Sequence, residues 1–115
     1  MDELKKLQMI FQTLSDYNRL VIIQSICNKE CPVGDLVKAT NLSQPLVSHH
    51  LKVLKDNGIL ETKRVGPFIY YYLKDIKILY AINLFIELFE NTEIKQNNEF
   101  KFCPEWIINN YKTKI

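Results

Sequence analysis

Hydrogen-bonding side chains recur along residues 44–56 at a spacing that places them on one face of a helix. With a turn of about 100° per residue, one side of this segment is small, polar or basic, and its members are Gln44, Pro45, Ser48, His49, Lys52, Lys55 and Asp56. The opposite side is mostly apolar and consists of Leu46, Val47, His50, Leu51, Val53 and Leu54. Donors and acceptors in the first turns of a helix, followed by cations, suit the base edges and phosphates of a DNA major groove. The alternative is an ordinary solvated face, but such faces more often carry Glu and Lys four residues apart.

A second basic site follows in the chain. Residues 59–73 are rich in β-branched and aromatic side chains and are divided by Gly66-Pro67, a pattern that predicts a two-stranded hairpin. Lys63 and Arg64 come just before the turn, where the tip of a hairpin can reach the DNA backbone or the minor groove. The polar helix and the basic hairpin together favour nucleic-acid binding more strongly than either does alone.

The elements that position these side chains are predicted from apolar spacing and from cap residues. We expect helices over about 4–14, 16–28, 32–40, 44–57 and 76–91, and a hairpin over 59–73. Ser43 is the expected N-cap of the fourth helix, and Gly58 is its expected stop. This order predicts a mainly α (α+β) fold, a dimeric winged helix-turn-helix with about five helices and a two-stranded wing. Residues 1–91 would form the DNA-binding and dimerisation domain, and residues 92–115 a C-terminal extension with a short helix packing on the dimer.

The segment at 76–91 is apolar nearly all round, and one chain of 115 residues offers little core to bury it on every side. We therefore expect a homodimer formed by this helix and the first one. The expected interface residues are Leu7, Phe11, Leu79, Ile82, Phe85 and Ile86. The alternative is a helix that lies wholly inside one protomer.

The distribution of charge and the sequence patterns along the chain exclude several classes of protein. The net charge is only +2, but residues 41–74 hold five basic and two acidic side chains, so the basic excess lies in the predicted DNA-binding region. The start of the chain lacks the features of a signal peptide, and the most apolar run, residues 76–89, is too short to cross a membrane. We expect a cytoplasmic protein without a membrane partner. No nucleophile beside a base, phosphate-binding loop or open metal cluster is recognisable, so we do not expect an enzyme.

Three cysteines, Cys27, Cys31 and Cys103, leave several interpretations open. Small buried side chains with no further role are the simplest one. A redox switch pairing Cys103 with Cys27 or Cys31 is a second, and a three-thiolate site for arsenite or another soft ion is a third. The odd number and the spacing argue against a disulfide framework and fit a reducing compartment.

Several stretches together resemble the ArsR/SmtB family of bacterial and archaeal repressors. They are residues 14–20 (LSDYNRL), 42–54 (LSQPLVSHHLKVL), 58–60 (GIL), 63–66 (KRVG) and 71–73 (YYL), within a similarity that covers about residues 7–90. The resemblance implies a homodimeric repressor that binds a two-fold symmetric DNA operator and is released by a signal, here unidentified. By position, it implies DNA contacts by Gln44, Ser48, His49 and the wing residue Arg64. The full expected DNA-binding set is Ser43, Gln44, Pro45, Ser48, His49, Lys52, Lys63 and Arg64.

The sensing sites of the family do not carry over. The thiolate motif of its metal sensors corresponds here to residues 30–36, where Pro32 and Gly34 replace both ligands. On the last helix Asp75 is present, but the residues near the other ligand positions cannot replace histidines; they are Lys77, Leu88 and Asn91. His49 and His50 diverge around their helix and cannot easily share an ion. We therefore expect no metal cofactor of the family type.

The alternative function is a winged-helix module for protein interaction that does not bind DNA specifically.

Overall fold

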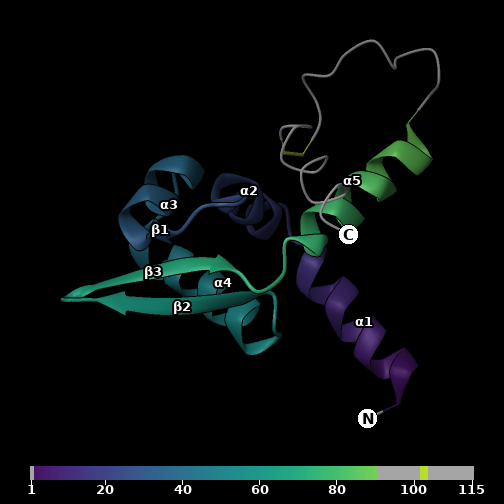
Figure 1. Cartoon of the computed structure of the whole chain (residues 1–115), viewed down its shortest axis with the longest axis horizontal. Helices are drawn as coiled ribbons and strands as arrows, with labels where there is room; N and C mark the ends of the chain where they lie inside the picture. Colours follow the sequence, from purple (N-terminus) through teal and green to yellow (C-terminus); the bar gives the residue numbers. More distant parts are fainter. Residues whose placement is uncertain (1, 91–101, 104–115) are drawn as a thin grey trace. The chain divides into compact units, whose positions relative to one another are not determined.

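The computed structural model describes residues 2–90 and 102–103, and the chain forms two compact units, Met1–Lys74 and Asp75–Ile115. The first unit contains four helices and a small sheet (Figure 1). Its elements are α1 (Glu3–Leu14), α2 (Tyr17–Ile26), β1 (Cys31–Pro32), α3 (Val33–Thr40), α4 (Gln44–Asp56), β2 (Leu60–Val65) and β3 (Phe68–Leu73). The second unit contains α5 (Lys77–Phe89). The predicted order of five helices and a hairpin is confirmed.

Local signals explain where the helices of the first unit begin and end. Asp2, Asp16 and Ser43 are the N-caps of α1, α2 and α4, and each side chain accepts a hydrogen bond from a backbone N–H three residues later. Asn41 ends α3 in the left-handed conformation. Gly58 follows α4 with φ of 77°, a value that glycine adopts without steric cost. The turn between α3 and α4 therefore has well-defined helix ends on both sides.

The sheet differs from the predicted two-stranded hairpin because it has a third, short strand. β1 pairs antiparallel with β3, Cys31 opposite Tyr71 and Pro32 opposite Tyr70, and the strand order is β1-β3-β2. A strand of two residues has no periodicity to reveal it, and Pro32 belongs to an edge strand, where the missing N–H costs no ladder bond. Pro32 is also the N-cap of α3.

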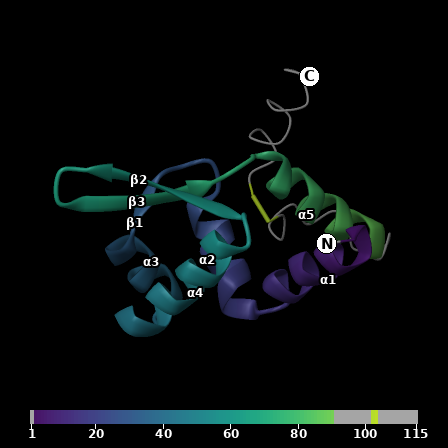
Figure 2. The same ribbon diagram turned by 90° about the horizontal axis from the view of Figure 1, so that it is seen from below.

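The core of the first unit lies where α2, α3, α4 and the base of the hairpin meet. Its fully buried side chains include Ile22, Ile23, Leu36, Leu51 and Leu60. The far end of the hairpin leaves this core, and its turn lies clear of α2, α3 and α4 in both views (Figures 1 and 2).

In the second unit, α5 carries a buried polar residue among apolar ones. The Asn83 side chain is 7% exposed; its Nδ2 donates to the Leu79 carbonyl at 2.9 Å, and its Oδ1 accepts from the Phe102 N–H at 3.1 Å. Both ends of the amide are thereby satisfied, which makes its burial tolerable. The expected C-terminal extension, with its short helix, lies almost entirely outside the described residues.

Candidate nucleic-acid interface

Helix α4 presents the predicted polar face to solvent. Gln44, Pro45, Ser48, His49 and Lys52 are all exposed. The opposite face is anchored, because Val47, Leu51 and Leu54 have no exposed surface and α4 packs against α2, α3 and β2. A helix held firmly on one side can present its other side to a ligand in one orientation.

One residue of the predicted apolar face lies elsewhere. Leu46 is 41% exposed, although helical periodicity placed it with the buried residues. It lies in the first turn of α4, directly after the α3–α4 turn, where the described elements leave this edge of the helix open. Its exposed methyl groups adjoin the polar face and add an apolar contact there.

The expected site residues at the start of α4 have two different tasks. The Ser43 hydroxyl oxygen accepts the Leu46 N–H at 3.4 Å and so caps the helix. Pro45 lies in the first turn, where its missing N–H is not needed by the helix. Gln44, Ser48 and His49 then project from the first two turns, the part of a recognition helix that reaches base edges.

The three expected cations are not equivalent in the folded chain. Lys52 pairs with Asp56 at 2.8 Å on the surface of α4, and this hydrogen-bonded partner raises the pKa of Lys52. Lys63 pairs with Glu30 at 2.9 Å, and the same cause raises its pKa. Arg64 is exposed and has no ion pair within residues 2–90. Surface ion pairs are weak, so a DNA phosphate can replace Asp56 as the partner of Lys52, or Glu30 as the partner of Lys63. Arg64 can bind a phosphate without first releasing a partner of this kind.

Strand alternation also separates Lys63 from Arg64. Successive side chains of β2 point to opposite faces, so Arg64 shares a face with the buried Leu60. This is the face of the sheet toward the core helices, α4 included. Lys63 points to the other face and ties the wing to the segment that precedes β1. The structure thus places Arg64, rather than Lys63, on the side of the wing that α4 occupies.

His50 behaves differently from its exposed neighbour His49. Its side chain is 6% exposed on the inner face of α4, and its Nδ1 has no hydrogen-bond partner within the described chain. Burial lowers the pKa of His50; the charges of Arg19 and His49 lower it further, and Asp16 opposes them. The imidazole is therefore held neutral at the junction of α4 with the start of α2.

The groups around His50 are themselves fixed in place. Asp16 accepts the Arg19 N–H at 3.1 Å, and the Arg19 guanidinium donates to the Thr13 carbonyl at 3.3 Å. Burial raises the pKa of Asp16, but the Arg19 N–H and the positive charges of His50 and Arg19 outweigh burial and lower it overall. Asp16 therefore stays ionised over the pH range in which His50 titrates.

Acidification is expected to destabilise the protein through His50. Because the pKa of His50 is lower in the folded chain than in the unfolded one, the unfolded chain binds more protons, and the free energy of unfolding falls as pH drops below about 6.5. His50→Gln should flatten this dependence between about pH 7 and about pH 5, measured by urea unfolding. The matched variant His49→Gln should retain the wild-type dependence. An equal slope in wild type and His50→Gln would assign the acid sensitivity to other groups.

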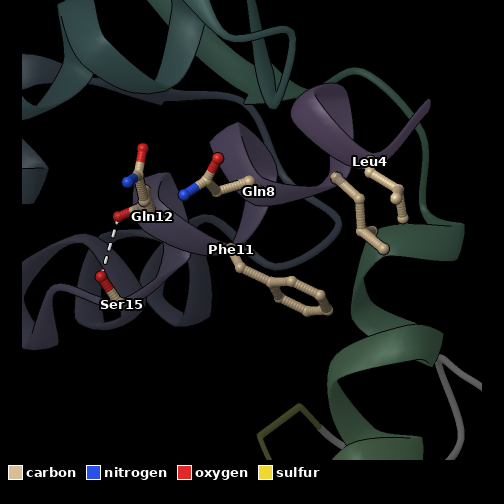
Figure 3. A pocket seen from close by; sticks show the side chains of 6 residues that line it. Leu4, Gln8, Phe11, Gln12 and Ser15 are labelled. Carbon is tan, nitrogen blue, oxygen red and sulfur yellow. Dashed lines mark hydrogen bonds between the residues drawn. The ribbon is translucent and has the colours of Figure 1, made fainter. Parts of the chain in front are cut away.

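Helix α1 carries an exposed apolar strip that includes two of the expected dimer residues. Leu7 and Phe11 are 46% and 47% exposed, and Leu4, which lies outside the expected interface set, is 78% exposed. Leu4, Leu7, Gln8, Phe11, Gln12 and Ser15 line a shallow hollow of about 480 Å³ (Figure 3). An apolar strip of this kind on a protein surface is typical of an interface.

Helix α5 carries a second exposed apolar strip. Phe85 is 50% exposed, and three further exposed side chains not in the expected set are Leu84, Leu88 and Phe89. Leu79, by contrast, has no exposed surface, so it belongs to the core of its own chain instead of an open contact face. Ile82 and Ile86 are half-buried.

The cysteines are buried at all three positions. Cys27, Cys31 and Cys103 are 6%, 6% and 3% exposed, and Cys31 is a free thiol. Burial raises the pKa of Cys31, Asp35 adds to the rise and Lys29 opposes it. A thiol of this kind stays protonated near neutral pH and is a poor nucleophile. Within residues 2–90 and 102–103, no three His, Cys, Asp or Glu side chains gather into a metal-binding group.

The α3–turn–α4 unit with a polar exposed α4 face, followed by a hairpin, defines a winged helix-turn-helix protein. Comparison with known proteins agrees: the family of bacterial regulatory proteins named arsR matches residues 16–62. Over 74 residues the chain is 34% identical to the transcriptional repressor SdpR of Bacillus subtilis, covering 64% of this chain and 82% of SdpR. It is also similar to the crystal structure of the transcriptional repressor BigR from Xylella fastidiosa, with a TM-score of 0.66, 30% identity, and coverage of 76% of this chain and 90% of that one. The chain belongs to the ArsR family.

A cadmium-related member shows how far the similarity extends. The cadmium resistance regulatory protein CadC of Listeria innocua is 37% identical over 75 residues, which cover 64% of this chain. The matched part spans 63% of the length of CadC.

In the described part of this chain, no helix has both the length and the apolar character needed to cross a membrane.

Proposed function

We propose that this protein is a sequence-specific DNA-binding repressor of transcription in the cytoplasm, acting as a homodimer on a two-fold symmetric operator. The single observation that carries the proposal is the division of α4: Val47, Leu51 and Leu54 are fully buried, and Gln44, Ser48 and His49 are exposed together. This arrangement is what a helix inserted into a major groove requires.

The exposed side chains of α4 supply the chemistry of base recognition. The Gln44 amide can form two hydrogen bonds with an adenine edge, and the Ser48 hydroxyl can donate or accept with any base. His49 offers one donor and one acceptor in its neutral form. Lys52 lies two turns into the helix, where it can leave Asp56 and meet a phosphate.

The wing adds a contact that does not depend on the major groove. Arg64 lies on the core-side face of β2, exposed and without an ion partner in the described residues. An arginine at this place can enter the minor groove, where a narrow groove concentrates negative potential. The wing therefore extends the interface beyond the reach of α4.

A homodimer is proposed because two separate helices, α1 and α5, each leave an apolar strip exposed. Two-fold pairing covers both strips with the same surfaces of a second copy. It also presents two α4 helices, which read half-sites about one helical turn of DNA apart.

The signal that releases the DNA is not a metal at the family thiolate position, because Pro32 and Gly34 have no ligating side chains.

Selection of binding sites from randomised duplex DNA tests the proposal. The purified, reduced protein at moderate salt is expected to enrich a two-fold symmetric sequence, and its affinity should fall steeply as salt rises. Failure of the folded dimer to enrich any sequence would contradict the proposal. That result would favour the protein-interaction module. The ion pairs that Lys52 and Lys63 form with acidic side chains are compatible with such a module.

A further inference from the structure

His50 is a buried, titratable side chain in the middle of the helix that the proposed function assigns to DNA. It is 6% exposed, and the fully buried Val47 and Leu54 lie one turn before and one turn after it on the same face of α4. Its Nδ1 atom is buried and has no hydrogen-bond partner among the described residues. Such atoms are rare in folded proteins because they cost free energy, so this one indicates a role beyond packing.

The start of α2 brings a second unpartnered atom to the same junction. α2 packs against α4, and the Nε of Arg19 is buried without a hydrogen-bond partner in the described chain, although the Nη1 of the same guanidinium donates to the Thr13 carbonyl. Arg19 Nε can only donate, whereas the Nδ1 of a neutral imidazole that carries its proton on Nε2 can only accept. The two atoms are therefore complementary when His50 is neutral, and both are donors when it is protonated.

The charged and titratable groups that act on His50 come from two elements. Within residues 2–90 they are Asp16 and Arg19 at the start of α2 and His49 on α4, whose ring centroid is 5.6 Å from that of His50. α3 and β2 also pack against α4, but no charged group of theirs contributes in this part of the chain. Burial lowers the pKa of His50, and with Arg19 and His49 it outweighs the opposing charge of Asp16. The observed seating of α4 therefore favours the neutral imidazole.

We propose that His50 is a positioning residue for α4: the neutral imidazole holds the helix in the setting that fits operator DNA, and protonation of the imidazole weakens specific binding. This inference rests on the proposed function. A protonated Nδ1 meets another donor in Arg19, and it gains an acceptor only if α4 moves so that the ring reaches Asp16 or water. The reading face moves with it, because Ser48 and His49 belong to the same turn of the helix.

Bound DNA opposes this movement, since the groove fixes the outer face of α4 while α2 fixes the inner one. His50 is then protonated less readily in the operator complex than in the free dimer, so specific binding releases protons and weakens as the pH falls. The weakening is confined to pH values below about 6.5, because the pKa of His50 in the folded chain lies below this ordinary histidine value. One proton per protomer limits it to about tenfold per protomer for each pH unit.

The test measures the affinity of the dimer for the selected operator and for a scrambled duplex at constant salt, from about pH 7.5 to about pH 5.5. The ratio of the two affinities should fall at least about tenfold in wild type and stay level in His50→Gln, which keeps a neutral acceptor. Asp16→Asn retains a good N-cap for α2 but removes the charge that favours the imidazolium, so its fall should shift to lower pH. Asp35→Asn, the same change at an exposed site on α3, is the matched control and should follow wild type.

NMR of the imidazole nitrogens adds a readout that a merely structural role would not move. The operator should lower the pKa of His50 relative to the scrambled duplex, which carries the same phosphate charge. Circular dichroism at each pH confirms that the protein stays folded, and if His50→Gln does not fold, the shift in Asp16→Asn and the NMR titration decide the question.

Three results would each overturn the positioning role. They are a ratio that stays level in wild type, a ratio that falls equally in His50→Gln, and a fall at the same pH in wild type and Asp16→Asn. If wild type prefers the operator at no pH, the proposed function itself fails. If wild type prefers the operator equally at neutral and acid pH, only the role of His50 fails.

Discussion

The double variant Ser48→Ala/His49→Ala is expected to lose sequence-specific DNA binding while it keeps its fold. Each good base contact contributes about 1–3 kcal/mol of discrimination, and a dimer repeats both contacts in two half-sites. The combined loss is comparable to the roughly 4–10 kcal/mol that separates specific from non-specific binding. Affinity for the operator should therefore fall to the level measured with a scrambled duplex.

Stability should be unaffected by this double change, because both side chains are exposed and alanine favours helix more than serine or histidine does. Fluorescence anisotropy with operator and scrambled duplexes, together with thermal unfolding, measures the two properties. Gln24→Ala, which removes an exposed polar side chain from α2, is the matched control and should bind as wild type does. A double variant that still prefers the operator would remove Ser48 and His49 from the reading surface.

Replacing Phe85 by glutamate is expected to convert the proposed dimer into monomers. Phe85 lies on the exposed apolar strip of α5 and keeps half of its surface open. Two-fold symmetry buries the new carboxylate twice, and each unpaired charge costs several kcal/mol on transfer to an apolar interface. The dimer dissociation constant should rise by a factor on the order of a thousand or more.

Analytical ultracentrifugation at several protein concentrations measures this change, and circular dichroism confirms that the helices persist. DNA affinity should fall as well, because a monomer reads one half-site. The conservative variant Phe85→Leu keeps an apolar contact and should remain dimeric. An unchanged dimer mass for Phe85→Glu in a folded protein would place the interface away from this part of α5.

The helices and the polar face of α4 could be predicted from residue order alone because both depend on near neighbours. A cap such as Asp16 or Ser43 acts on the N–H three residues later, and helical periodicity fixes which side chains share a face. The exposure of Gln44, Ser48 and His49 follows from that periodicity. Leu46 departs from it because its exposure depends on where the neighbouring elements end.

Tertiary packing alone decided the features that join distant residues. β1 exists because Cys31 and Pro32 meet Tyr70 and Tyr71. The same folding brings Glu30 to Lys63, 33 residues away, and so leaves Arg64 as the wing cation without an ion partner in the described chain. Pairings of this kind depend on the path of the whole chain, and no spacing within a short window encodes them.

The same distinction holds for His50, Leu79 and Phe68. Periodicity placed His50 on the inner side of α4, but only the fold brought it to Asp16 and Arg19, whose charges act on its pKa. Leu79 and Phe68 are both apolar, yet one is fully buried and the other 59% exposed. Residue type sets the free energy that burial would release, and the packing of the folded chain determines which side chains are buried.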